Sequence, residues 1–174
     1  ELNKTFDEVL NEVKSEDKYI KGKALELLAI WMIRLSGLRF IDWRKRDNET
    51  GSGEVDVLAA SDSFTYSRWQ IQCKNTKTVH VDHIAKEVGM TFQTNADVIM
   101  FITTGKYTSD AIQFSDNINS RSRYYIILLD ENDLHQISNN ITSFIDILDK
   151  KAKLTFMKKE YFMKNDEIEE FIHN

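Results

Sequence analysis

The sequence predicts an α/β fold in which helices flank a mixed central sheet. Three strand-like segments, residues 38–44, 55–60 and 67–75, follow one another across short polar turns, which favours antiparallel pairing. Two almost wholly apolar runs follow, 98–103 and 124–129, with a helical pattern between them. Such runs are typical of parallel strands covered on both faces. Early pairing followed by a strand–helix–strand unit therefore predicts one mixed sheet.

Apolar residues three or four positions apart predict the helices that surround this sheet. In the first of them, Phe6, Val9, Leu10 and Val13 recur at helical spacing. The expected helices are a leading helix over 5–18, a longer one over 22–35 that ends at Ser36-Gly37, one over 82–92, one capped by Ser109 or Asp110, a short one from Asp133, one over 141–148 and a terminal acidic helix over 166–173.

Length and composition indicate an ordinary globular domain. The chain has 174 residues, of which 41% are hydrophobic and 29% charged, enough for one domain with a full core. Its single cysteine, Cys73, excludes an internal disulfide and fits a reducing compartment, so we expect a cytoplasmic protein. The longest apolar stretch, 25–38, is interrupted by Glu26 and Arg34, which argues against a membrane span. The chain does not begin with methionine, which leaves room for a further DNA-recognition or effector domain outside it.

The most informative pattern joins an acidic turn to a polar strand. The turn ends in Asp56, and the strand that follows reads Trp69-Gln-Ile-Gln-Cys-Lys-Asn75. Residues two apart in a strand share a face, so Gln72 and Lys74 project together while Cys73 turns away. A carboxylate, an amide oxygen and an ammonium group at one place suit metal-assisted hydrolysis of a phosphodiester. Taken alone, Asp56 is equally explained as a turn residue that begins a strand.

This stretch resembles the PD-(D/E)xK nuclease superfamily, and within it the Mrr-type restriction endonucleases, in which glutamine often replaces the second acid. Gly22-Lys-Ala-Leu-Glu26 opens a helix and places Glu26 where the family carries a helix-borne glutamate. The resemblance covers about residues 20 to 137 and implies a three-layer restriction-endonuclease-like core. We accordingly divide the chain into a leading helix (1–19), a nuclease core (20–137) and a C-terminal helical appendage (138–174).

The resemblance also implies the chemistry and the roles of the residues. Asp56, Gln72 and the backbone carbonyl of Cys73 would bind Mg²⁺, for which Mn²⁺ would substitute. Lys74 would position or activate the attacking water, and Glu26 would complete the site through a second metal ion or a bound water. The expected activity is a magnesium-dependent endodeoxyribonuclease that acts in restriction.

Charge and function suggest the partners. The net charge of −5 argues mildly against binding to nucleic acid, because phosphate affinity depends on lysine and arginine. Basic residues nevertheless cluster around the acidic turn, and we expect Arg44, Lys45, Arg46 and Lys77 to contact DNA. Cutting both strands of a duplex needs two sites or two visits, so we expect a homodimer or larger assembly. Leu154, Phe156, Tyr161 and Phe162 could supply its interface.

The sequence is also compatible with two other functions. Archaeal-type Holliday-junction resolvases share Lys21-Gly22 and Glu26, although they usually carry an acid where this chain has Gln72. A catalytically inactive nucleic-acid-binding or assembly module with the same fold would keep these elements without binding metal. His80 and His83 are spaced as a metal pair, but no third ligand accompanies them in the sequence, so we interpret them as ordinary polar residues.

Overall fold

The computed structural model describes residues 3–46, 54–61 and 66–160 and contains one mixed sheet of five strands in the order β1-β2-β3-β5-β7. These strands are β1 (Arg39–Arg46), β2 (Glu54–Ser61), β3 (Ser67–Lys74), β5 (Val98–Thr103) and β7 (Tyr125–Leu129). Neighbours from β1 to β3 pair antiparallel, whereas β3, β5 and β7 pair parallel. The predicted mixed sheet is confirmed.

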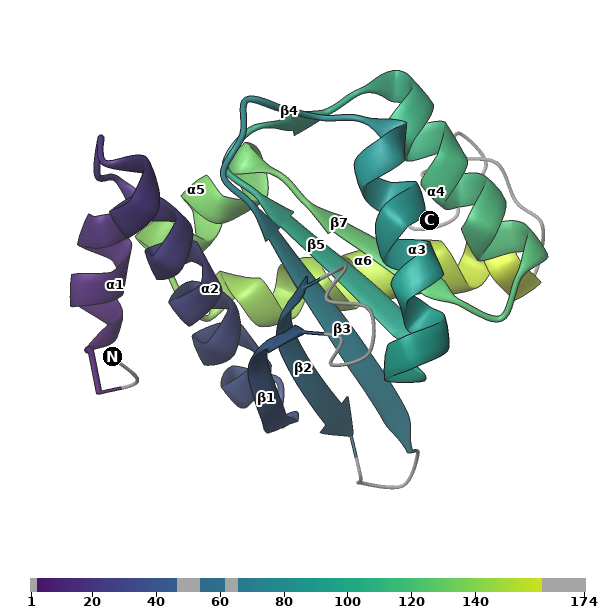
Figure 1. Ribbon diagram of the computed structural model, residues 1–174, viewed down its shortest axis with the longest axis horizontal. Helices are drawn as coiled ribbons and strands as arrows, with labels where there is room; N and C mark the ends of the chain where they lie inside the picture. Colours follow the sequence, from purple (N-terminus) through teal and green to yellow (C-terminus); the bar gives the residue numbers. More distant parts are fainter. Residues whose placement is uncertain (1–2, 47–53, 62–65, 161–174) are drawn as a thin grey trace.

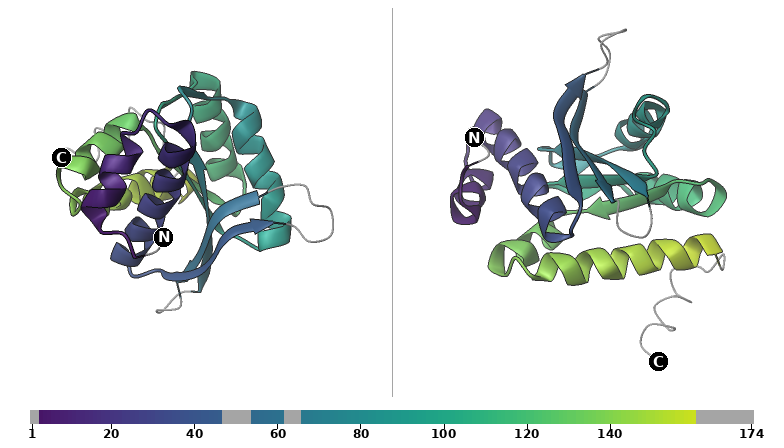
Figure 2. Two further views of the ribbon diagram at one scale, coloured as in Figure 1. Left: turned by 60° about the vertical axis from the view of Figure 1, so that its left-hand side comes forward. Right: turned by 90° about the horizontal axis from the view of Figure 1, so that it is seen from below.

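The six helices in the described part of the chain are α1 (Phe6–Val13), α2 (Lys18–Leu35), α3 (Val81–Thr94), α4 (Ser109–Arg121), α5 (Glu131–Asn139) and α6 (Ser143–Glu160). They cover both faces of the sheet (Figure 1). One face packs on α2, α5 and α6 through a core that includes Ile71, Met100 and Ile102. The other face packs on α3 and α4 through Ile99 and Phe101, and Figure 2 shows α6 on the opposite side of the sheet from α3.

The limits of β5 were predicted correctly because this strand lies at the centre of the fold. All six of its residues are buried, because neighbouring strands lie on both sides and helices cover both faces. Alternating polar residues would have no solvent to face at this position, so the strand reads as one apolar run. Its observed limits, Val98 and Thr103, are the predicted ones.

Several helix ends differ from the prediction because the capping residue lies earlier in the chain. Asp17 accepts the N–H groups of Tyr19 and Ile20, so α2 begins at Lys18. This earlier start of α2 leaves α1 shorter than expected, from Phe6 to Val13. Thr108 caps α4 in place of Ser109 or Asp110, and Asp130 caps α5.

Residues 138–160 of the segment expected as an appendage are instead packed onto the folded core. Helix α6 runs without a break to Glu160, although the expected helix ended at residue 148. Phe144 is fully buried under the sheet, and Lys158 binds Asp116 on α4 at 2.6 Å. Tertiary packing of this kind prolongs a helix whose own apolar pattern is weak. Of the residues proposed for a dimer interface, Phe156 is exposed, while Tyr161, Phe162 and the expected terminal helix lie outside the described residues.

A second, two-stranded sheet was not predicted. It pairs β4 (Thr78–Val79) with β6 (Lys106–Tyr107). Strands of two residues are too short to show any periodicity, so only tertiary pairing defines them. Separately, no helix in the described ranges is both long and apolar enough to cross a membrane.

Candidate active site

Strands β2 and β3 stop pairing next to Asp56. Their pairing runs from Ser61↔Ser67 to Val57↔Ile71 and is not continued to Asp56. Beyond that point β2 stays paired with β1, and β3 continues beside β5 as far as Lys74. The divergence leaves a fork whose inner edge lacks ladder hydrogen bonds.

Asp56 fills this fork with its carboxylate. Its Oδ2 accepts a hydrogen bond from the backbone N–H of Cys73 at 2.6 Å and another from Nε2 of Gln72 at 2.6 Å. The predicted neighbours in the sequence pattern are therefore neighbours in space. The carboxylate compensates an N–H group of β3 that would otherwise have no partner in the fork.

Burial changes the acidity of Asp56. The residue is 9% exposed, and desolvation raises the pKa of its carboxyl to about 7, against the opposing effect of the Cys73 N–H. The charge of Glu26 adds to the rise in this pKa, and the charge of Lys74 reduces it. A buried carboxylate of this kind is destabilised as an anion, and a bound cation would offset that cost.

Gln72 offers a side-chain oxygen that no described residue binds. The residue is 4% exposed, and its Oε1 is buried without a hydrogen-bond partner among the described residues. Unpartnered buried acceptors are rare because each costs the desolvation of a polar atom. An amide oxygen is a suitable ligand for a hard cation such as Mg²⁺. The donor set at the fork therefore fits the expected metal.

The backbone carbonyl of Cys73 offers a further oxygen at the fork. The N–H and C=O groups of one strand residue lie on the same side of the strand, and the N–H of Cys73 faces Asp56. The backbone carbonyl of Lys74 faces the other side of the strand, where it accepts from the N–H of Thr104 at 3.2 Å. The carbonyl of Cys73 is thus directed at the fork. Its thiol lies toward α2, 3.7 Å from the carbonyl oxygen of Leu25.

Glu26 is close to the fork but is engaged with β1. Its Oε2 accepts from Nε1 of Trp43 at 2.6 Å and from Nε of Arg44 at 2.7 Å, and its Oε1 accepts from Nη2 of Arg44 at 3.0 Å. This bidentate pair raises the pKa of Arg44. Arg44 adopts a left-handed backbone with φ of 54°, a conformation that non-glycine residues rarely adopt.

The residues expected to contact DNA differ in whether their side chains face solvent. The guanidinium of Arg44 is turned inward onto Glu26, whereas we expected it to face DNA. Lys77 is exposed. The side chains of Lys45 and Arg46 lie outside what the structure describes.

Lys74 occupies the end of β3, where its backbone carbonyl accepts two hydrogen bonds from residues at the end of β5. Its carbonyl accepts from Oγ1 of Thr103 at 2.9 Å as well as from Thr104. Its charge lowers the pKa of Asp56 and of Glu87, so the ammonium group lies near both carboxyls. No acidic side chain among the described residues is within ion-pair distance of it, which leaves the ammonium group available to a substrate.

Glu87 of α3 was missed in the sequence. It is fully buried, and its Oε2 accepts from Nε2 of Gln70 at 2.8 Å. Oε1 of Gln70 accepts in turn from Oγ1 of Thr94 at 2.8 Å. Burial raises the pKa of Glu87, and its Oε1 has no partner within the described ranges. The available signal was an acid on the apolar face of a helix, between Ile84 and Thr91.

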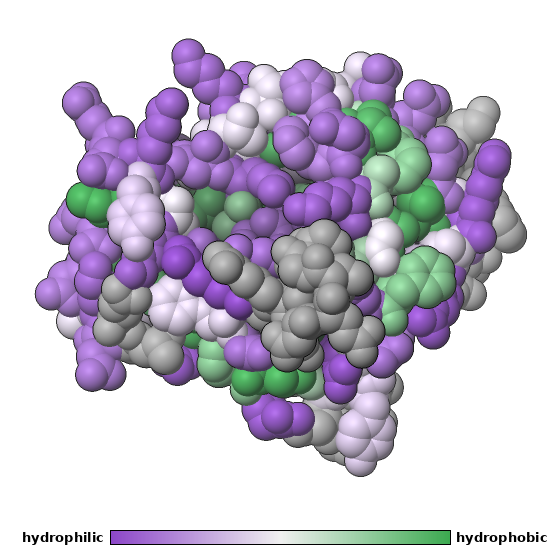
Figure 3. Space-filling model, in the orientation of Figure 1, coloured by the Kyte–Doolittle hydropathy of each residue, from purple (hydrophilic) through white to green (hydrophobic). Residues whose placement is uncertain are grey.

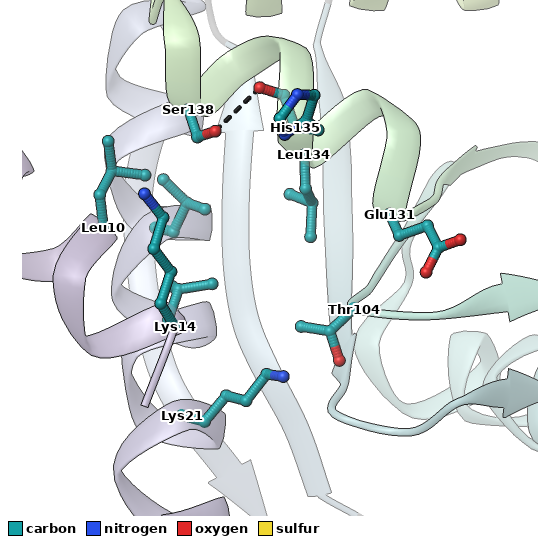
Figure 4. Close-up of a pocket in the computed structure, with 10 residues that line it drawn as sticks. Leu10, Lys14, Lys21, Thr104, Glu131, Leu134, His135 and Ser138 are labelled. Atoms are coloured by element: carbon teal, nitrogen blue, oxygen red, sulfur yellow. Dashed lines mark hydrogen bonds between the residues drawn. The ribbon is translucent and has the colours of Figure 1, made fainter. Parts of the chain in front are cut away.

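A cavity of about 370 Å³ lies beside the Lys74 end of β3, between α1, α2 and α5 (Figure 4). Its lining combines an apolar base with basic and hydroxyl side chains: Leu10, Val13, Lys14, Lys21, Leu28, Thr104, Glu131, Leu134, His135 and Ser138. Oγ1 of Thr104 donates to Asn75 at 3.0 Å, and Nδ2 of Asn75 donates to the carbonyl of Lys18 at 3.2 Å. These bonds join the cavity wall to the end of the strand that bears Lys74.

Outside the fork and the cavity, the described surface has fewer features that indicate a binding site. In the view of Figure 3, hydrophilic side chains dominate the face and apolar ones appear in small separate areas. His80 precedes α3, as expected, and its N–H donates to Nδ1 of His83 at 3.2 Å. Within the part of the chain that the structure describes, no three His, Cys, Asp or Glu side chains are grouped to hold a metal ion. A metal at the fork would therefore depend on amide and carbonyl oxygens beside Asp56.

Comparison with known proteins shows the family and the fold of the chain. A family model described as restriction endonuclease, of the Mrr catalytic type, matches residues 18–138. The solved structure of the DNA modification-dependent restriction endonuclease AspBHI aligns with 84% of this chain and 38% of its own, at 14% identity and a TM-score of 0.53. This likeness shows a shared restriction-endonuclease-like fold.

Two further solved structures are similar at lower TM-scores. The MspJI restriction endonuclease, solved in complex with a 27-mer oligonucleotide, aligns with 83% of this chain and 35% of its own, at 17% identity and a TM-score of 0.43. A protein of unknown function, AF1548, aligns with 58% of this chain and 54% of its own, at 12% identity and a TM-score of 0.42. The chain thus covers between 35% and 54% of the length of these three solved chains. No curated protein sequence matches it.

Proposed function

Because the chain belongs to the restriction endonuclease family, we propose that it is a metal-dependent DNA endonuclease whose active site is the fork between β2 and β3. One observation supports this most directly. A buried carboxylate, Asp56, and an unpartnered buried amide oxygen, on Gln72, lie together beside the ammonium group of Lys74. The decisive assay is magnesium-dependent nicking of plasmid DNA.

Asp56, Gln72 and the Cys73 carbonyl would hold the metal ion, and Glu26 would complete the site. When bound, Mg²⁺ supplies positive charge that stabilises a phosphodiester under attack and acidifies water. Lys74 holds its ammonium group beside these ligands. It would orient the attacking water and offset the negative charge that develops on the phosphate.

The pair between Glu26 and Arg44 suggests how the protein could change when DNA binds. A DNA phosphate competes for a guanidinium in the same bidentate geometry as a carboxylate. If Arg44 turned to a phosphate, Glu26 would lose two of its three hydrogen bonds and become free to complete the metal site. This exchange would reconcile the two roles expected from the sequence for Arg44 and Glu26.

Gln72→Glu is expected to retain cleavage and to bind Mg²⁺ more tightly, because a carboxylate adds charge where the amide adds none. Gln72→Ala removes the ligand oxygen and should weaken Mg²⁺ binding by at least about 10- to 100-fold, the loss that even outer partners of a metal cost. Isothermal titration with Mg²⁺ and plasmid nicking would measure the two effects. Unchanged Mg²⁺ affinity in Gln72→Ala would remove Gln72 from the site.

The same assays separate the rival functions. A junction resolvase would cut a four-way DNA junction in preference to a duplex of the same sequence. An inactive module would bind no Mg²⁺ at Asp56 and would not nick plasmid DNA. The proposal requires both metal binding and duplex cleavage.

The DNA backbone would continue from the fork along the cavity at the end of β3, whose lining includes two lysines. Figure 4 shows Lys21 directed at Thr104 across the cavity and Lys14 extending into it, and neither has an acidic partner among the described residues. The cavity's acidic residue, Glu131, is already paired with Lys106 at 3.3 Å. Two unpaired lysines at one concave surface favour an anion, here a phosphate next to the one that is cut.

The variant Lys14→Ala with Lys21→Ala is expected to weaken DNA binding equally for all sequences. Loss of two phosphate contacts should reduce the slope of log affinity against log salt by about 1.8, at about 0.9 for each contact. The matched control, Lys150→Ala with Lys153→Ala, removes two exposed lysines from α6 and should leave the slope unchanged. Equal slopes for the two double variants would place the DNA elsewhere.

A further inference from the structure

We propose that Thr103, the last residue of β5, is a positioning residue of this active site, whose buried hydroxyl fixes the backbone of Lys74 and with it the direction of the ammonium group. The inference rests on the proposed function. It assigns a role to β5, a strand that carries none of the expected site residues.

Thr103 is a buried polar residue at the end of an apolar strand. The five residues of β5 that precede it are all apolar, and Thr103 itself is completely buried. A valine would fill nearly the same volume without the cost of burying a hydroxyl group. The polar side chain therefore needs an explanation at this position, and its partners supply one.

The hydroxyl of Thr103 joins the ends of β3 and β5. Its Oγ1 donates to the carbonyl of Lys74 at 2.9 Å and accepts from the N–H of Gly105 at 3.2 Å. The carbonyl of Thr76 lies further away, at 3.5 Å. A hydroxyl has one hydrogen to donate, so the shorter contact, to Lys74, is the stronger of the two donor contacts.

The backbone of Lys74 depends on this bond because few others hold it. Lys74 ends β3, and β2 pairs with β3 no further than Ile71, so β5 is the strand beside it. The N–H of Thr104 reaches the Lys74 carbonyl at 3.2 Å, a longer contact than that of the Thr103 hydroxyl. The hydroxyl is therefore the closer of two donors that hold the peptide unit after Lys74.

The end of β5 is itself closely packed. Gly105 lies against the backbone carbonyls of Thr76 and Lys77, where a Cβ atom would collide with them. Lys106 donates its N–H to the carbonyl of Lys77 at 3.0 Å. The end of β5 is thus a fixed support for the segment that follows β3, and the hydroxyl of Thr103 extends this support to the last residue of that strand.

A fixed backbone gives the side chain of Lys74 a defined direction. Lys74 and Thr103 are partners in the parallel ladder, so their side chains leave the sheet on the same face. The lysine side chain is long and flexible, and a rotation of its backbone would move the ammonium group relative to Asp56 and Gln72. A displacement of about 1 Å can cost about 100-fold in rate. The proposed metal ligands lie on other peptide units, so metal binding does not depend on this hydroxyl.

Thr103→Val tests the proposal, because valine keeps the shape of threonine and removes the hydroxyl. We expect kcat for plasmid nicking to fall about 10- to 100-fold, with KM and the Mg²⁺ dissociation constant within about twofold of wild type. Thr103→Ser keeps the hydroxyl and should restore kcat to within about threefold of wild type, even if the lost methyl group lowers its melting temperature. The matched control, Thr155→Val, removes a buried hydroxyl that donates to the carbonyl of Lys151 on α6 at 2.9 Å, and it should leave kcat unchanged.

The outcomes are distinguishable. If wild-type protein neither binds Mg²⁺ nor nicks DNA, the proposed function fails whatever the Thr103 variants do. If wild type is active and Thr103→Val has the same kcat, the inference is overturned. Equal losses of kcat in Thr103→Val and Thr103→Ser would also overturn it, and so would a loss of Mg²⁺ affinity that matches the loss of kcat. Should Thr103→Val fail to fold by circular dichroism, Thr103→Cys replaces it, because a thiol is only a weak donor, and wild-type kcat in that variant would count against the role.

Discussion

Lys74→Ala is expected to abolish plasmid nicking while the protein stays folded and still binds Mg²⁺. The ammonium group is the cation that this chain places next to Asp56 and Gln72, and its removal leaves the attacking water unoriented and the phosphate charge uncompensated. Loss of one such preorganised electrostatic contact typically costs roughly 100- to 1,000-fold in rate. Lys74 is half-buried at a strand end, so its side chain contributes little to the core.

The comparison with Asp56→Ala separates the two roles at the fork. Asp56→Ala should lose both Mg²⁺ binding and cleavage, whereas Lys74→Ala should lose cleavage alone. Lys150→Ala serves as the matched control, because Lys150 is an exposed lysine on α6 that has no proposed role at the site or in DNA binding. Plasmid nicking, Mg²⁺ titration and circular dichroism would be measured for all three variants. Cleavage by Lys74→Ala at the wild-type rate would remove the proposed active site.

Asp56→Asn is expected to inactivate the protein and at the same time to stabilise it in the absence of metal at pH 8. Burial raises the pKa of Asp56 from its ordinary value of 3.8 to about 7, so the folded state holds a proton that the unfolded state has lost. Stability therefore falls as the pH rises from about 4 to about 7, and the penalty is complete above the folded pKa. Three pKa units correspond to at most about 4 kcal/mol, at about 1.4 kcal/mol for each unit. Asparagine keeps an acceptor for the Cys73 N–H without the buried charge.

Thermal melting at pH 5 and pH 8, with and without Mg²⁺, checks this prediction. Wild type should lose more stability than Asp56→Asn between the two values of pH, although Glu87 adds a loss of the same sign to both proteins. Mg²⁺ should raise the wild-type melting temperature more at pH 8 than at pH 5, because the metal binds the deprotonated carboxylate. It should not shift Asp56→Asn. Identical pH dependence in the two proteins would show that Asp56 is not the titrating group.

The sequence by itself determined the strands and the facing of the polar residues on them. Alternation with period two is a local property, so the pairing of Gln72 with Lys74 on one face followed from the chain alone. The apolar run of β5 was equally unambiguous, because a strand covered on both faces excludes polar residues. The family match over residues 18–138 confirms that the order of these motifs carried real information.

Only the tertiary structure decided how these residues meet. The divergence of β2 from β3 at Val57 creates the fork that Asp56 fills, and no local pattern marks where two strands stop pairing. The partners of Glu26 also depend on contacts made far apart in the sequence, with Arg44 18 residues away. The burial of Glu87 was not predicted from the sequence, because burial depends on which element lies opposite a helix face. Local periodicity fixes which way a side chain points along its own element, whereas charge, desolvation and partners are set by the neighbouring elements that the fold brings together.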